Sequence, residues 1–132
     1  MGVRWNATVI DCRDTAAQGR WWAEVLGWQI AYEDSDEVAI VPPHAMTARA
    51  ESIPVEERGP GLVFVTVPEG KSVKNRLHID VAPGAGGDQQ AEVDRLVSLG
   101  ASRVDVGQPA DATFVVMADP EANEFCVLSP RD

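Results

Sequence analysis

Several features that define whole classes of protein are missing from this sequence of 132 residues. Its apolar runs are only a few residues long, whereas a membrane-spanning helix needs about 20. The N-terminus, Met-Gly-Val-Arg-Trp-Asn, lacks the basic-then-apolar form of a secretory signal peptide. Only two cysteines occur, Cys12 and Cys126, both inside apolar strand-like segments. We therefore expect buried thiols in a reducing cytoplasm and no disulfide framework.

Positive charge is also scarce, since 11 Lys and Arg stand against 21 Asp and Glu and the net charge is −10. Nucleic-acid backbones and anionic membranes repel such a surface, so we expect neither as a partner. The acidity could favour a cationic ligand, or it could simply maintain solubility. No Gly-rich phosphate loop, Cys-x-x-Cys pair or nucleophile elbow is present.

The hydrophobic content of 45% is ordinary for a soluble globular protein, and the length is most simply that of one domain, residues 1–132. Asp14 and Asp88 are suited to N-cap two helices, which Gly27 and Gly100 would end. Outside the helices, short apolar or alternating segments predict strands. We expect helices at about 14–26 and 88–99, and strands at about 7–12, 28–33, 38–42, 61–67, 76–81, 103–106, 113–118 and 124–128. Residues 43–60 have the composition of a loop, and a connection of this length is often a lid or a rim.

The two halves of the chain repeat one order of elements. Each half is a strand, a helix ending in Leu-Gly, and then three strands. The simplest account is an α+β fold made of two βαβββ repeats, at about 5–67 and 74–129. Each repeat would form a curved mixed sheet with its helix on the convex side, and the two sheets would enclose a concave cavity.

Residues 76–81, Arg-Leu-His-Ile-Asp-Val, alternate between polar and apolar side chains. Successive side chains of a strand point to opposite faces, so this segment predicts an apolar stripe and a polar row. The apolar stripe comprises Leu77, Ile79 and Val81, and the polar row comprises Arg76, His78 and Asp80. The polar row could face solvent, as in any half-buried strand, or form the floor of a pocket.

Four motifs resemble the vicinal oxygen chelate superfamily, which includes glyoxalase I, extradiol dioxygenases and bleomycin-resistance proteins. They are Asp-Cys-Arg-Asp at 11–14, Trp-Trp-Ala-Glu-Val-Leu-Gly-Trp at 21–28, Lys-Asn-Arg-Leu-His-Ile-Asp at 74–80 and Asp-Pro-Glu-Ala-Asn-Glu-Phe-Cys at 119–126. The last two resemble its glyoxalase-like branch, and the resemblance spans about 7–128. It implies that helices cover the apolar stripe, that the polar row lines the cavity, and that the chain is a homodimer. Ala122 departs from the family turn, which usually has Gly there, and would be strained if its φ is positive.

The resemblance also allows a metal site to be tested position by position. Metal-dependent members hold a divalent ion with four side chains, usually His, Gln or Glu, one from each of four strands. Here the four positions fall on His78, on Cys126, near Phe64 and near Ala7. Alanine and phenylalanine cannot coordinate an ion, and a thiol is a poor partner among hard ligands. We therefore expect a metal-free cavity and no cofactor.

Two alternative metal sites remain open. Shifting by two residues keeps the strand face, so His78, Asp80 and Glu124 could form a set of one imidazole and two carboxylates. A soft zinc site of His78 with Cys126 is the other alternative, although two ligands rarely suffice.

The remaining hypotheses concern a small-molecule ligand. His78 could be a polar anchor, a general acid/base or a structural imidazole bonded to Asp80 or Arg76. An apolar wall of Leu62 and Phe64 would suit a planar or hydrophobic guest. Trp22 has the spacing of a core residue but could also contact a ligand. The candidate ligand-binding residues are His78, Asp80, Arg76, Phe64, Leu62, Trp22, Cys126 and Glu124.

Three functions follow from these residues. The leading hypothesis is a small-molecule-binding protein of the glyoxalase/bleomycin-resistance type, metal-free, with an apolar or cationic metabolite in the cavity. The second is a glyoxalase-like lyase or isomerase, using either a metal at His78, Asp80 and Glu124 or His78 alone as acid/base. The third is an interaction module whose cavity is filled by its own side chains, because fold alone does not determine function.

Overall fold

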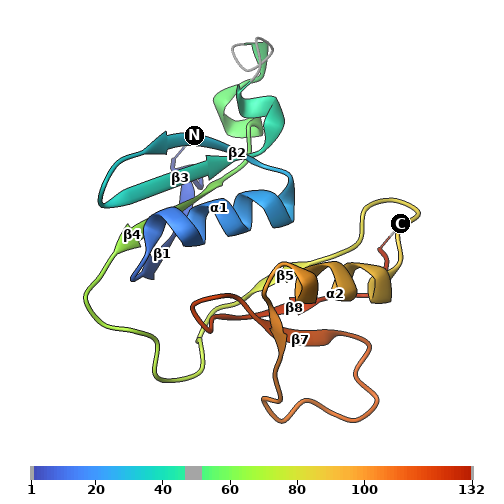
Figure 1. The fold of residues 1–132 in the computed structure, drawn as a ribbon. Helices are drawn as coiled ribbons and strands as arrows, with labels where there is room; N and C mark the ends of the chain where they lie inside the picture. The colour runs from blue at the N-terminus through green and yellow to red at the C-terminus, as the bar shows by residue number, and fades with distance from the viewer. Residues whose placement is uncertain (1, 47–51, 132) are drawn as a thin grey trace. The chain divides into compact units, whose positions relative to one another are not determined.

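The computed structural model describes residues 2–46 and 52–131. These residues fall into two compact units, which divide between Gly70 and Lys71. Each unit contains one four-stranded sheet and one α-helix (Figure 1). Part of the predicted loop at 43–60 lies outside the described residues. Its described parts include two short 3₁₀ turns, η1 (Pro43–Met46) and η3 (Val55–Glu57). The prediction of a single domain stays a prediction.

The first unit has the predicted βαβββ order. Its elements are β1 (Ala7–Cys12), α1 (Thr15–Leu26), β2 (Gln29–Glu33), β3 (Glu37–Val41) and β4 (Gly61–Thr66). The strands lie in the order β1-β4-β3-β2, with β1 parallel to β4 and the other neighbours antiparallel. The sheet is therefore mixed, as the repeat predicted.

Helix α1 begins and ends where its caps predict. The Asp14 carboxylate accepts a hydrogen bond from the Ala17 N–H at 3.0 Å, and Gly27 closes the helix with φ +67°. Gly19 faces the sheet, since a Cβ there would lie 2.5 Å from Val38 Cγ1 and 3.6 Å from Phe64 Cδ2. The missing side chain therefore allows α1 to pack closely on β3 and β4.

The second unit repeats the arrangement. Its elements are β5 (Ile79–Val81), α2 (Gln89–Ser98), β6 (Ser102–Arg103), β7 (Val115–Ala118) and β8 (Glu124–Val127). The strand order is β5-β8-β7-β6, with β5 parallel to β8. The Asp88 carboxylate caps α2 by accepting from the Ala91 N–H at 2.9 Å. The most buried side chains of this unit are Val93, Leu96, Met117, Phe125 and Val127.

Strand β5 is shorter than predicted, which corrects part of the apolar stripe. It pairs with β8 only through Ile79, Asp80 and Val81. Leu77 lies in a bend before the strand and is 86% exposed. The physical reason is that the backbone before β5 bonds a side chain and not a neighbouring strand. The Asn75 N–H donates to the Glu124 carboxylate at 3.1 Å. The apolar stripe therefore consists of Ile79 and Val81.

The strand predicted at 103–106 is also shorter, and ends at Arg103. The Val104 N–H still donates to the Val116 carbonyl of β7 at 3.1 Å, and bonds to side chains follow after it. The Asp105 carboxylate accepts from the Gly107 N–H, and the Gln108 side chain accepts from the Val106 N–H. Such bonds compete with ladder pairing and turn the chain away from β7.

The fold class is confirmed as α+β with two mixed four-stranded sheets, one from each repeat. The predicted concave cavity depends on how one unit is placed against the other, so it stays a prediction.

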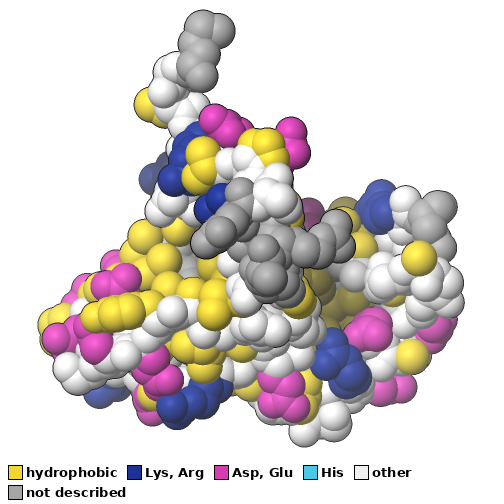
Figure 2. Space-filling view, turned by 90° about the horizontal axis from the view of Figure 1, so that it is seen from above, with side chains coloured by type: hydrophobic (Ala, Val, Ile, Leu, Met, Phe, Trp, Pro, Cys, Tyr) yellow, Lys and Arg dark blue, Asp and Glu magenta, His cyan; other side chains and the backbone are white. Residues whose placement is uncertain are grey.

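Hydrophobic side chains remain visible at the surface among acidic and basic ones (Figure 2). In the part of the chain that the structure describes, neither helix has the length and apolar character needed to cross a bilayer.

Candidate functional site

A cluster of three side chains in the second unit joins β5 to β8. His78, Asp80 and Cys126 each offer one potential ligand atom, and these atoms all lie within 4.8 Å of one another. Asp80 and Cys126 are register partners across the parallel pair of strands, so their side chains share one face. His78 precedes β5 and lies two residues before Asp80, and it joins them. The sequence-based prediction that these three side chains share a face agrees with this arrangement.

His78 and Asp80 contact each other directly. The imidazole Nε2 lies 3.1 Å from a carboxylate oxygen of Asp80, and the two side chains are 44% and 49% exposed. A carboxylate that engages one ring nitrogen fixes the orientation of the ring, and so of its other nitrogen. Of the two structural partners predicted for His78, the structure therefore supports Asp80. Arg76 is exposed in the bend before β5.

Cys126 forms the buried part of the cluster. Burial raises the pKa of its thiol, and the negative charge of Asp80 raises it further, while the positive charge of Lys74 acts in the opposite direction. Without a cation the thiol is therefore protonated at neutral pH. A thiolate is the reactive form, so Cys126 is unsuited to act as a nucleophile by itself.

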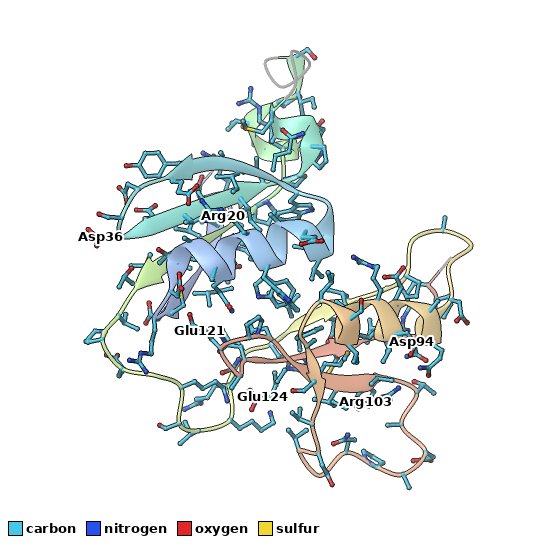
Figure 3. The ribbon with its side chains drawn as sticks, viewed as in Figure 1. Arg20, Asp36, Asp94, Arg103, Glu121 and Glu124 are labelled. Carbon is cyan, nitrogen blue, oxygen red and sulfur yellow. The ribbon has the colours of Figure 1, made fainter. Side chains whose placement is uncertain are left out.

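Glu124 is bonded within the second unit, and its predicted contact with a ligand stays a prediction. Its carboxylate lies 3.0 Å from Lys71 Nζ and accepts from the Asn75 N–H at 3.1 Å. Figure 3 labels Glu124 at the start of β8. Burial opposes ionisation of Glu124, but the bonds from Asn75 and Lys71 outweigh it, so the pKa of this carboxyl is lowered. Glu124 thus holds residues 71–75 against β8.

The predicted metal set of His78, Asp80 and Glu124 is not brought together. Within residues 2–46 and 52–131, one group of three or more His, Cys, Asp or Glu side chains is close enough to hold a metal ion. It consists of His78, Asp80 and Cys126. The pair of His78 and Cys126 considered as a soft site lies in this cluster together with Asp80. The sequence did not show that Lys71 would form an ion pair with Glu124.

The residues predicted to form an apolar cavity wall lie in the core of the first unit. Leu62 and Phe64 are buried, and Phe64 is next to the helix residue Gly19. The face opposite α1 is formed by the alternate residues of β4, Val63 and Val65, which are only partly buried. The sequence could not decide which face of β4 these residues occupy. A shift of one residue exchanges the two faces of a strand, and residues 61–65 have no polar side chain that marks the exposed face.

Two further predicted residues are placed by the structure. Trp22 is buried, in agreement with its core interpretation. Ala7 is the register partner of Gly61 in the parallel pair β1 and β4, and neither residue has a ligand atom in its side chain. Contact of Trp22, Leu62, Phe64 or Arg76 with a ligand stays a prediction.

Comparison with known protein families gives one match that covers most of the chain. The model of the glyoxalase-like domain matches residues 7–128. No curated protein matches the sequence significantly.

Solved structures with a similar fold come from several bacteria. FosX, a fosfomycin resistance protein from Listeria monocytogenes complexed with Mn(II) and sulfate, has a TM-score of 0.69 at 10% identity, covering 99% of this chain and 93% of that one. A glyoxalase/bleomycin resistance protein/dioxygenase family enzyme from Burkholderia phytofirmans has 0.61 at 18%, covering 98% and 100%. A glyoxalase-related enzyme from Fulvimarina pelagi has 0.60 at 15%, covering 94% and 87%. At these identities the likeness shows the fold.

Proposed function

Because this chain belongs to the glyoxalase-like domain family, we propose that it is a small-molecule-binding protein whose ligand contacts His78, Asp80 and Cys126. The observation that supports the proposal is the cluster itself. It combines a half-exposed imidazole and carboxylate with a buried thiol, all within 4.8 Å. Binding sites commonly place a few polar groups at fixed positions next to apolar surface.

The ligand class follows from the charge of these groups. Asp80 is about half exposed and can accept a hydrogen bond from a cationic or donor group of a ligand. The net charge of −10 attracts small cations over a longer range. We therefore propose a cationic metabolite with an apolar body.

Calorimetric titration with cationic aromatic metabolites and with their neutral isosteres tests this function. Asp80→Asn should weaken binding of the cations by about tenfold or more, because a charge-assisted hydrogen bond is lost. Asp94→Asn is the matched control, since Asp94 is an exposed acid on α2 that bonds Gln90 instead. Absence of binding across the panel, or equal losses in both variants, would contradict the proposal.

The second candidate function is a glyoxalase-like lyase or isomerase. Its support is the 3.1 Å contact between His78 and Asp80, because a carboxylate-oriented imidazole is suited to proton transfer near neutral pH. His78→Gln should abolish turnover of any substrate found by screening, while circular dichroism shows an intact fold. Unchanged turnover in that variant would remove His78 from the chemistry.

A homodimer remains part of the proposal, since it is expected from the resemblance to the superfamily. Sedimentation equilibrium of the full chain measures it directly. A mass of one chain at all concentrations tested would contradict it.

A further inference from the structure

The cluster on β5 and β8 has the donor atoms of a metal site that differs from the four-strand arrangement of metal-dependent relatives. We propose that His78, Asp80 and Cys126 bind one zinc ion, using ligands from the second unit alone. The ion would use the same three side chains as the ligand of the proposed function, and titration with metal alone, without any organic ligand, tests it separately.

The spacing of the donors suits a single ion. Zinc binds nitrogen, oxygen and sulfur at roughly 2.0–2.3 Å, so two donors that share one tetrahedral ion lie about 3.3–3.7 Å apart. The His78 and Asp80 atoms are 3.1 Å apart, and all three donors lie within 4.8 Å. Small side-chain rotations therefore suffice to bring them onto one ion.

The chemistry of the donors favours zinc in particular. An imidazole, a carboxylate and a thiolate are all accepted zinc ligands, and the two anionic groups would neutralise the charge of the ion. Three protein ligands leave a coordination position for water or for a ligand. Half-exposed His78 and Asp80 allow access from solvent, while Cys126 is buried.

The same thiol argues against manganese. Manganese prefers oxygen ligands, whereas a thiolate favours zinc and softer ions. The FosX structure from Listeria monocytogenes was determined with Mn(II), so this chain would differ in metal preference. In the first unit, Val63 and Val65 on the face opposite α1 and Ala7 on β1 have no ligand atoms, so the site cannot rely on the four-strand set.

Cobalt substitution provides a readout that requires no enzymatic activity. The full chain, purified with a non-thiol reductant and stripped with a chelator, is titrated with Co²⁺ and then with Zn²⁺. We expect a thiolate-to-cobalt charge-transfer band in the near ultraviolet, saturating at one ion per chain and bleached by zinc. Manganese should compete at least about 100-fold less effectively than zinc.

The two cysteines of the chain allow a matched comparison. Cys126→Ser should abolish the band and weaken zinc binding by about 100-fold or more, because loss of a direct ligand exceeds the effect of losing an outer partner. Cys12→Ser should retain the band, since Cys12 is buried in the first unit. Loss of the band in Cys12→Ser with retention in Cys126→Ser would overturn the proposal.

Two further variants decide the outcome if Cys126→Ser does not fold. Asp80→Asn and His78→Gln change half-exposed side chains and should preserve the circular dichroism spectrum. Both remove a proposed direct ligand, so each should weaken zinc binding by about 100-fold or more. Unchanged zinc affinity in both, absence of the cobalt band in the wild type, or equal affinities for manganese and zinc would each overturn the proposal.

Discussion

Glu124 and Lys71 form an ion pair of 3.0 Å between residues that are 53 positions apart in the sequence. Their side chains are only 12% and 17% exposed, so solvent screens the pair less than it screens a surface pair. The same carboxylate accepts from the Asn75 N–H. The pair therefore anchors to β8 the segment that leads to His78.

Removing the Glu124 carboxylate should destabilise the fold. Glu124→Ala leaves a largely buried ammonium and a backbone N–H without their acceptor, and we expect a loss of about 2 kcal/mol in the free energy of unfolding. Urea denaturation monitored by circular dichroism measures it. Lys71→Ala and the double variant complete a thermodynamic cycle, with an expected coupling of about 1 kcal/mol. A coupling near zero would show that the pair contributes nothing.

The Glu124 pair should also make stability depend on pH. The pKa of Glu124 is lowered below its ordinary value of 4.5, because the Asn75 and Lys71 bonds outweigh the opposing effect of burial. A depressed folded-state pKa means that the stabilisation is fully present above the unfolded-state pKa and is lost as pH falls through the folded-state pKa. The stability difference between wild type and Glu124→Gln should therefore shrink on acidification below about pH 4.5. A constant difference between neutral pH and about pH 3 would contradict this.

Ala122 and Gly27 have the same left-handed backbone angle, φ +67°. A side chain in that conformation costs about 1–2 kcal/mol, so Ala122→Gly should stabilise the protein by about 1 kcal/mol. Gly27→Ala is the matched control with the opposite sign, since a Cβ at Gly27 would meet nothing within 4 Å and its cost would come from the backbone alone. Thermal unfolding of both variants checks the pair. Destabilisation by Ala122→Gly would show that the turn carries no such strain.

The sequence predicted those parts of the fold that depend on local chemistry. Asp14 and Asp88 mark helix starts because a carboxylate there accepts an orphan N–H, and both do so. The resemblance to the family turn drew attention to Ala122, and its φ is indeed positive, +67°. The shared face of Asp80 and Cys126 followed from strand alternation within the family order of elements.

Features that depend on distant pairing were not predicted. The faces of β4 could not be assigned, because residues 61–65 are apolar or glycine throughout and alternation is absent. Leu77 fits the alternation of a strand, but the chain bends there because Asn75 bonds Glu124. The partner of Glu124 lies 53 residues away, and no local pattern indicates such a pair. The sequence therefore grouped Asp80 with Glu124 in one alternative and His78 with Cys126 in the other, and did not group all three residues of the cluster.

The charge of Lys74 provides a last prediction for the proposed zinc site. Lys74 is close enough to Cys126 to influence the pKa of the thiol. Zinc binding with release of the thiol proton adds one net positive charge to the cluster, which the Lys74 ammonium repels. Lys74→Gln should therefore tighten zinc binding by roughly threefold to tenfold at low salt, and less at high salt because exposed charges are screened.

Arg103→Gln is the control for Lys74→Gln, because it removes one positive charge at the opposite edge strand of the same sheet, β6. That variant should leave zinc affinity nearly unchanged. Competition of each variant with a chromophoric chelator, at two salt concentrations, measures both affinities. Weaker zinc binding in Lys74→Gln would contradict the prediction. It would mean that Lys74 acts mainly by favouring the thiolate form of Cys126, which strengthens zinc binding, and not by repelling the ion. Equal tightening in both variants would mean that the ion responds to overall charge and not to the cluster of His78, Asp80 and Cys126.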